Sequence, residues 1–351
     1  MSIDLFHRLI PFLSYTDLVY LQGWGEPLLN KHIFEMVRFC KERGKRVGFT
    51  TNGMLLTEDR IRMLVDLELD ILGVSLAGTT AGTHNRIRKG TDYDKLVFNL
   101  DLLSKIKAER KVKAPEVHLA YLMLRSNFHE LKEILPLAIR VGAKEIVAGN
   151  LTLIVDPELS AQAIFNHSAS IEPQKRANKS KNGKLPYGRR SPTACPPGRR
   201  ALWAGGCGEL QYYRSRLEEI RKRACRENII FDYHGPGIDD ASLYCRENVR
   251  RACVINVNGE VVPCVFTNPV LCENRGLGNG RSSCYMFKGQ FFPLTGISFG
   301  NIQNETLTRI WNKKEYAGFR DLFDPETATR PEQILSEMPK CCVKCYKRLG
   351  V

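Results

Sequence analysis

The first 150 residues repeat one pattern, in which short apolar runs alternate with longer stretches whose apolar residues recur at helical spacing. In the stretch 31–43, for example, Ile33, Val37 and Cys40 share one helix face, and Gly44 is a suitable end. Strands that alternate with helices predict a parallel sheet with right-handed crossovers. The runs that predict strands are residues 18–21, 47–53, 71–76, 117–124 and 144–148.

Other stretches carry the same helical signal. Leu5, Leu9 and Phe12 predict an amphipathic helix over residues 2–13, and Thr57 is a suitable N-cap for a second helix. Further helices are expected from Asp94 to about Arg110, up to Val141, and over 211–227. Cys40 lies on the apolar face of the helix predicted over 31–43, so the simplest interpretation is a thiol buried in the core.

The carboxyl ends of parallel strands meet at one edge of a sheet, where ligands of open α/β sheets bind. The groups expected there are small, polar or charged, as a small-molecule site requires, although solvated loops would give the same pattern. They are Gly23–Glu26, Thr50–Asn52, Ser75, Arg125–Asn127 and Gly149–Asn150. In the first turn, the two glycines allow a ligand to approach the backbone or allow a positive φ. Glu26 offers a carboxylate to a ligand ammonium.

Length and composition predict a globular protein of two to three domains: 351 residues, of which 43% are apolar and 26% charged. No apolar run approaches the roughly 18 residues that a membrane helix needs. The N-terminus lacks the basic and apolar regions of a signal peptide. We therefore expect a cytoplasmic protein without membrane association.

The net charge of +14 is concentrated in one region. Residues 171–251 carry 18 Lys and Arg against 9 Asp and Glu, and so contribute +9. Such a region can attract nucleic acid or an acidic protein. Aromatic residues are sparse there and no nucleic-acid module is recognisable, so a solvated basic insertion is an equally good interpretation.

Cysteines form a second candidate centre, because 11 of the 12 follow residue 190. In a cytoplasmic protein such clustering favours metal or iron–sulfur ligation. Asn258-Gly259 between two apolar runs predicts a hairpin that brings Cys253 and Cys264 together. With Cys342-x2-Cys345 these give four thiolates. They suit a structural zinc or a [4Fe–4S] cluster, and spacing alone does not decide between them.

The turn Gly23-Trp24-Gly25-Glu26-Pro27-Leu28 resembles the Gly-Gly-Glu-Pro turn of the radical S-adenosylmethionine (SAM) enzymes. Thr50–Gly53, Ser75, Ile87–Gly90 and Leu122–Asn127 resemble later strand-end motifs of that family, in the same order. The resemblance implies a partial (β/α) barrel in which the turn holds the methionine amino group of SAM. Its implied SAM contacts are Gly23, Trp24, Gly25, Glu26, Pro27, Thr51, Asn52, Ser75, Arg125 and Asn127.

The C-terminal region resembles the SPASM/twitch extension of the same enzymes. The resemblance lies in Gly259-x4-Cys264, Gly300-Asn301-Ile302, Thr308–Asn312 and the final Cys-x2-Cys. It implies one auxiliary [4Fe–4S] cluster, since the chain lacks the two further cysteines of the full SPASM pattern. The implied ligands are Cys253, Cys264, Cys342 and Cys345, with Cys245 as the alternative to Cys253.

The family's Cys-x3-Cys-x2-Cys loop should precede the first turn, yet no cysteine occurs before Cys40. We expect a truncated start, with the motif encoded in frame upstream of Met1. The alternative is a non-catalytic iron–sulfur or zinc protein that has lost the radical cluster.

The fold expected is a partial barrel over 1–155, a basic connecting region over 156–244, and a small cysteine-rich domain over 245–351. The resemblance implies that the complete enzyme cleaves SAM reductively to a 5′-deoxyadenosyl radical. It also implies an electron donor such as a ferredoxin or flavodoxin. A peptide or protein substrate is expected, and the catalytic residues themselves are not identified.

Overall fold

A computed structural model of the chain describes residues 1–165, 208–238, 242, 245–268, 284–324 and 331–351. The predicted linker at 156–200, with Cys195, lies mostly outside these residues, as do Cys207 and Cys272. Its first part forms the short helix α7 (Pro157–Gln162). Among the described residues, no helix has both the length and the hydrophobicity to cross a membrane.

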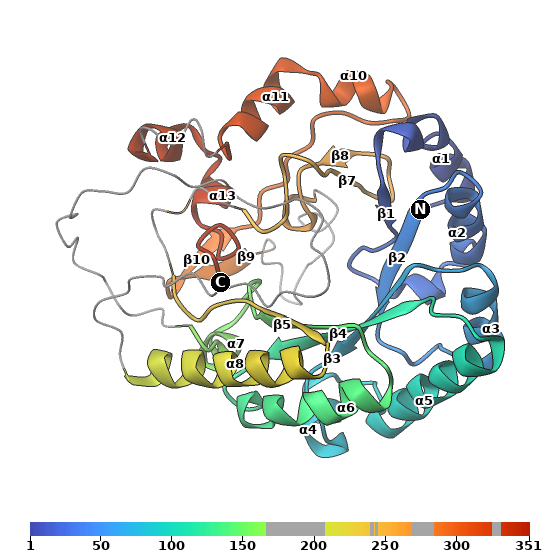
Figure 1. Ribbon diagram of the computed structural model, residues 1–351. Coiled ribbons are helices and arrows are strands. Elements are labelled where there is room, and N and C mark those ends of the chain that lie inside the picture. Colours follow the sequence, from blue (N-terminus) through green and yellow to red (C-terminus); the bar gives the residue numbers. More distant parts are fainter. Residues whose placement is uncertain (166–207, 239–241, 243–244, 269–283, 325–330) are drawn as a thin grey trace.

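A curved sheet of parallel strands forms the larger part of the molecule (Figure 1). The strands pair in sequence order, as expected for successive right-handed β–α–β units. Five were predicted, and the sixth, β6, follows a basic helix and was not. The strands are β1 (Leu18–Tyr20), β2 (Arg46–Thr51), β3 (Ile71–Leu76), β4 (Glu116–Met123), β5 (Glu145–Asn150) and β6 (Ile230–Tyr233).

Helices cover the outer face of this sheet, as Figure 1 shows for α2, α3, α5, α6 and α8. Their buried faces carry the predicted apolar residues, such as Ile33, Val37 and Cys40 on α2, and join the sheet in one large core. Three short 3-10 helices also belong to this part: η1 (Ile10–Tyr15), η2 (Pro27–Leu29) and η3 (Phe128–Glu133). The α-helices are α1 (Ile3–His7), α2 (Ile33–Lys41), α3 (Glu58–Asp66), α4 (Ala81–Ile87), α5 (Tyr93–Arg110), α6 (Ile134–Arg140) and α8 (Gly208–Arg226).

Two helix predictions need correction. The single helix over 2–13 is instead α1 followed by η1, because Pro11 cannot donate an intrahelical hydrogen bond and its ring disfavours a continuous α-helix. The stretch up to Val141 is likewise divided into η3 and α6. Thr57 caps α3 as predicted, since its side chain accepts a hydrogen bond from the Arg60 amide. The predicted basic helix is confirmed as α8, with Leu217, Ile220 and Ala224 buried.

The C-terminal elements lie across the open side of the sheet (Figure 1). The predicted hairpin is confirmed: its two strands are antiparallel, and Gly259 between them has φ +86°. A Cβ at Gly259 would lie 2.7 Å from Asn301 Oδ1, so only glycine fits this turn. The elements are β7 (Val254–Ile255), β8 (Val261–Val262), η4 (Val265–Thr267), β9 (Cys284–Phe287), β10 (Gln290–Pro293), α10 (Leu307–Trp311), α11 (Lys314–Asp321), α12 (Pro331–Glu337) and α13 (Lys340–Val343).

A second hydrophobic core holds most of these elements together and includes Leu5 of α1. Strand β9 belongs to a third core, with Ile154 and Tyr346. Arg8, just after α1, donates a hydrogen bond to the Gln303 carbonyl at 3.2 Å. The start of the chain therefore packs on the C-terminal region as well as on the barrel.

Candidate functional site

The turn after β1 holds the Glu26 carboxylate in a fixed position. Thr51 Oγ1 donates to Glu26 Oε1 at 2.6 Å, and the Asn52 amide donates to Oε2 at 2.8 Å. The Leu28 amide also donates to Oε1, at 3.2 Å, while Pro27 begins η2. Glu26 Oε2 accepts only one of these bonds, so it retains acceptor capacity for a ligand.

The two glycines of this turn are exposed, and the fold itself does not require them. Neither Gly23 nor Gly25 has a positive φ, and a Cβ on either would meet nothing within 4 Å. That a ligand approaches the backbone of these two glycines closely stays a prediction, which the open space supports. The predicted positive φ is wrong. Open space lies over the backbone beside a fixed carboxylate.

Trp24 links this turn to the C-terminal region. Its indole Nε1 donates to the Val265 carbonyl at 3.0 Å. Its ring lies 5.6 Å from that of Phe266, centroid to centroid. Residues 24 and 266 are distant in sequence, so this contact fixes the first turn against the segment that follows β8.

The other predicted residues lie along the carboxyl ends of the next strands. Ser75 is half-buried near the end of β3, opposite Ala120 of β4. Arg125 follows β4, where Nε donates to the Ala163 carbonyl at 3.0 Å and Nη1 pairs with Glu209 of α8. The Arg125 guanidinium is therefore engaged on one side by α8, a partner that the sequence reading missed.

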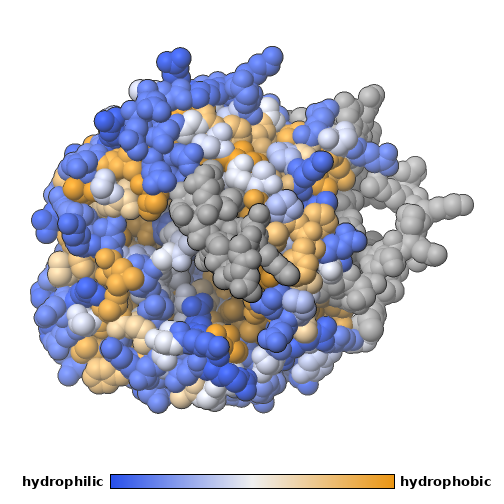
Figure 2. All heavy atoms as spheres, turned by 180° about the vertical axis from the view of Figure 1, so that it is seen from behind, coloured by the Kyte–Doolittle hydropathy of each residue, from blue (hydrophilic) through white to orange (hydrophobic). Residues whose placement is uncertain are grey.

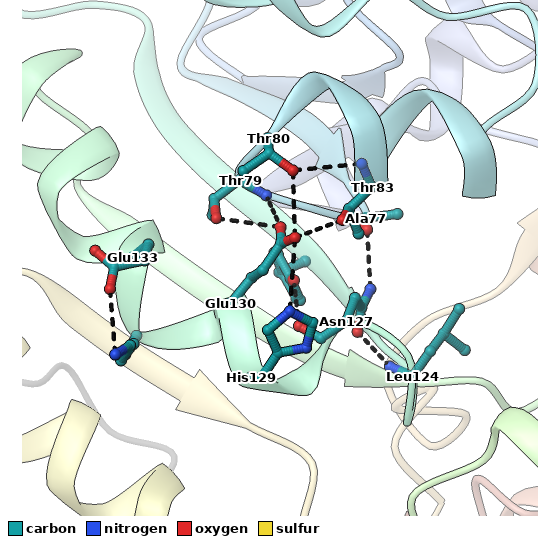
Figure 3. Close-up of polar contacts among 11 residues, drawn as sticks. Ala77, Thr79, Thr80, Thr83, Leu124, Asn127, His129, Glu130 and Glu133 are labelled. Carbon is teal, nitrogen blue, oxygen red and sulfur yellow. Dashed lines mark hydrogen bonds and ion pairs between the residues drawn. The ribbon is translucent and has the colours of Figure 1, made fainter.

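Asn127 is fully buried, and its side chain braces two strand ends (Figure 3). Its Nδ2 donates to the carbonyls of Ala77 and Leu122, at 2.9 and 2.8 Å, and its Oδ1 accepts from the Leu124 amide at 2.7 Å. These bonds use both N–H groups of the amide and one acceptor site of its oxygen. Asn127 thus positions the ends of β3 and β4.

Next to it, Glu130 of η3 is a buried carboxylate that the sequence reading did not identify. It accepts hydrogen bonds from the Thr79 amide at 2.8 Å, from the Thr80 hydroxyl at 3.2 Å, and from the Thr83 hydroxyl (Figure 3). Burial alone would raise the pKa of Glu130, but these hydrogen bonds outweigh it and the pKa is lowered. An ionised Glu130 therefore ties the loop after β3 to the turn after β4.

The second centre is a cavity between the segment after β5 and the C-terminal elements. Its walls include Thr152 and Leu153 on one side, and aromatic residues such as Phe266 and Tyr285 on the other. Five thiols line it: Cys245, Cys264, Cys341, Cys342 and Cys345. Four of the five cysteines predicted as ligands thus meet in one place, together with Cys341.

Cys253 does not line this cavity. The hairpin register pairs Val254 with Val262, which places Cys253 opposite Pro263. Like Cys245 and Cys341, Cys253 packs against the second hydrophobic core, and burial there raises the pKa of Cys253 to about 11.

The cavity thiols are strongly desolvated. Burial raises the pKa of Cys245 to about 12 and that of Cys264 to about 11, and it raises the pKa of Cys345 as well. A buried thiol resists ionisation in an apolar site unless a positive centre compensates its charge. Bound iron supplies that compensation, so the donor chemistry fits an iron–sulfur cluster.

Among the described residues, no three His, Cys, Asp or Glu side chains form a ready-made metal site. Four thiolates from one cavity could hold either a structural zinc or a [4Fe–4S] cluster. The donor set by itself does not decide between the two metals.

Comparison with known proteins agrees with this geometry. Residues 15–138 match the radical SAM superfamily, and residues 245–346 match the SPASM iron–sulfur cluster-binding domain. The chain therefore belongs to the radical SAM superfamily, in the subgroup with a SPASM domain. The two domains imply iron–sulfur clusters and SAM as cofactors.

Relatives cover most of the chain at low identity. The tungsten-containing aldehyde ferredoxin oxidoreductase cofactor-modifying protein of Pyrococcus furiosus is 25% identical, over 91% of this chain and 75% of that protein. PqqA peptide cyclase of Bradyrhizobium diazoefficiens is 28% identical, over 38% of this chain and 33% of its own. Streptococcus suis SuiB bound to its precursor peptide SuiA has the same fold, with a TM-score of 0.53 and 13% identity. The alignment covers 98% of this chain and 63% of SuiB.

Proposed function

We propose that this chain provides the SAM-binding barrel and one auxiliary [4Fe–4S] cluster of a radical SAM enzyme that modifies a peptide or protein. The observation that carries the proposal is the Trp24 contact with Val265 and Phe266. Through it, the turn at Gly23–Glu26, which we call the SAM turn for its proposed role, contacts a segment that lines the cysteine cavity. The two proposed cofactor sites are therefore neighbours.

On the SAM side, Glu26 is the residue proposed to accept hydrogen bonds from the methionine ammonium. Thr51 and Asn52 fix its carboxylate, and Gly23 and Gly25 leave room for the ligand. Ser75 and Arg125 are proposed as further contacts, with Asn127 acting through the strand ends that it braces. Bound SAM, cleaved with one electron from a donor such as a ferredoxin or flavodoxin, would supply a radical that abstracts hydrogen from the substrate, and the surrounding residues would orient and shield it.

In the cysteine cavity, the proposed cluster ligands are Cys245, Cys264, Cys342 and Cys345. Cys245 replaces Cys253 as the preferred fourth ligand, because it lines the cavity and Cys253 does not. Cys341 precedes Cys342 in the sequence and is not proposed as a ligand. Zinc in the same cavity, in a non-catalytic protein, is the second candidate, since thiolates also bind zinc.

A peptide or protein substrate is proposed from the relatives and from the surface of the molecule. One relative is named PqqA peptide cyclase, and SuiB is seen bound to its precursor peptide SuiA. Hydrophobic residues, orange in Figure 2, lie among polar ones on the face shown there. The net charge of +14 favours a substrate with acidic side chains.

Equilibrium dialysis with labelled SAM tests the SAM side of the proposal. We expect saturable binding to the anaerobically purified chain. Glu26→Gln should weaken it by about 10- to 100-fold, the equivalent of losing a charge-assisted hydrogen bond. The matched control is Glu58→Gln, which removes a carboxylate that only pairs with Arg62 on the surface of α3. Absence of saturable binding, or equal binding by the Glu26 variant, contradicts the proposal.

The substrate class has a separate test. Fluorescent peptides of equal length, one rich in Glu and one rich in Lys, are titrated at low and high salt. The acidic peptide should bind more tightly, and salt should weaken its binding. Preference for the basic peptide contradicts this part.

A further inference from the structure

We propose that Glu247 and Lys347 act on the reduction potential of the auxiliary cluster in opposite directions, and that their ion pair keeps these two effects in balance. This inference rests on the cluster proposed above and adds two residues that are not ligands. Glu247 and Lys347 both line the cavity, and their charged groups are in contact. They come from separate segments, 100 residues apart in sequence.

The pair is held in place on several sides. The side chains are only 20% and 19% exposed. The Lys347 ammonium also lies 4.6 Å from the centroid of the Phe266 ring, in a cation–π contact. Phe266 in turn packs against Trp24. The two charges therefore stay at a fixed place in the cavity wall and do not move freely in solvent.

Both residues stand close to proposed ligand sulfurs. Glu247 follows Cys245 by two positions, and its backbone amide is hydrogen-bonded to the Cys245 sulfur. Lys347 has the same relation to Cys345, whose sulfur also accepts from the Arg348 amide. Both charges therefore lie in the cavity wall beside the proposed ligand sulfurs.

The sign of each effect on the cluster follows from charge. Reduction adds one negative charge to an already anionic cluster, so a nearby cation favours the reduced form and a nearby anion disfavours it. In the intact pair the two effects largely cancel. Removing one partner leaves the other charge uncompensated at a site of low dielectric.

The test is the midpoint potential of the cluster in the whole chain, from a redox titration followed by electron paramagnetic resonance. Lys347→Met should lower the potential, because Glu247 remains. Glu247→Gln should raise it, because Lys347 remains. The double variant restores charge balance and should return close to the wild-type value. Iron and sulfide content are measured in every sample, so that only proteins with the full cluster are compared.

Lys344→Met is the matched control. Lys344 also lines the cavity, but its ammonium lies over the Phe292 ring, 3.5 Å from the centroid. Its replacement should shift the potential less than that of Lys347. An equal shift, or shifts of the same sign for the Lys347 and Glu247 variants, overturns the inference.

The outcomes separate the two proposals. A wild-type chain that binds no iron overturns the proposed cluster itself. If the cluster is present but its potential is the same in Glu247→Gln as in the wild type, only the proposed role of the ion pair is overturned. If Lys347→Met does not retain the cluster, the nearly isosteric Glu247→Gln still decides, and a lowered or unchanged potential contradicts the inference.

Discussion

The SAM turn and the cysteine cavity are organised in opposite ways. At the turn, Glu26 is already held by hydrogen bonds from Thr51 and Asn52, and the open space lies beside it. In the cavity, buried thiols with raised pKa values surround a space without forming a close set among the described residues. The first site is preorganised by the protein, whereas the second requires its cluster to be complete.

The two sites should therefore differ in how much stability is lost when the ligand of each is absent. A preorganised polar site loses little when its ligand is absent, because its groups already satisfy one another. A site whose ligands are buried thiols couples binding to folding, so metal removal should loosen the C-terminal core. The predictions that follow test this contrast, starting with the largest effect.

Replacing a cavity cysteine should have the largest effect. Cys264→Ala is expected to lose most of the iron and to lower the thermal stability of the C-terminal region by many degrees, since ligation is coupled to folding there. Iron content and thermal unfolding measure this. Cys253→Ala is the control, because Cys253 does not line the cavity, and it should keep its iron. Equal losses in both variants contradict the ligand set.

A side chain at Gly25 should abolish SAM binding and leave stability unchanged. Gly25→Val fills the open space over the turn, where a Cβ meets no neighbour within 4 Å. We expect SAM affinity to fall more than tenfold, with the free energy of unfolding within about 0.5 kcal/mol of wild type. Gly82→Ala on α4 is an equally open control and should bind SAM normally. A large stability loss in Gly25→Val means that the fold itself requires that glycine.

Glu130→Ala should cost about 1–3 kcal/mol of stability, because it leaves the Thr79 amide and the Thr83 hydroxyl without their acceptor. The pH dependence provides the sharper test. The pKa of Glu130 is lowered in the folded state, so its contribution is present above the ordinary carboxyl value of about 4.3 and is lost as the pH falls through the folded value. Glu130→Gln should therefore flatten the loss of stability at acidic pH. An unchanged acid profile argues against an ionised Glu130.

Trp24→Phe should have the smallest effect of this series. It keeps an aromatic ring against Phe266 but removes the indole hydrogen bond to the Val265 carbonyl, worth about 0.5–1.5 kcal/mol. We expect a small fall in melting temperature and an unchanged iron content. Loss of iron from this variant would show that the turn supports the cavity more strongly than the contacts suggest.

Local signals in the sequence predicted much of the fold. Gly259 in its turn and Thr57 at its cap carry chemistry that acts within a few residues, and both were placed correctly. The single helix over 2–13 failed because Pro11 overrides the apolar pattern. Strand β6 was missed because Asp232 interrupts its short apolar run.

The candidate site was harder to predict where it depends on distant partners. The turn at Glu26 was visible from residue types alone, whereas the contacts of Glu130 join segments about 50 residues apart. The choice between Cys245 and Cys253 depends on which of the two thiols lines the cavity, and spacing does not reveal it. Likewise, the Arg125–Glu209 contact could be predicted only by knowing where α8 packs.

The most direct test of the account is the iron, sulfide and zinc content of the 351-residue chain purified without oxygen. One auxiliary cluster predicts about four irons and a matching amount of sulfide per chain, with little zinc. Stoichiometric zinc with little iron would contradict the cluster and favour a structural metal in the same cavity.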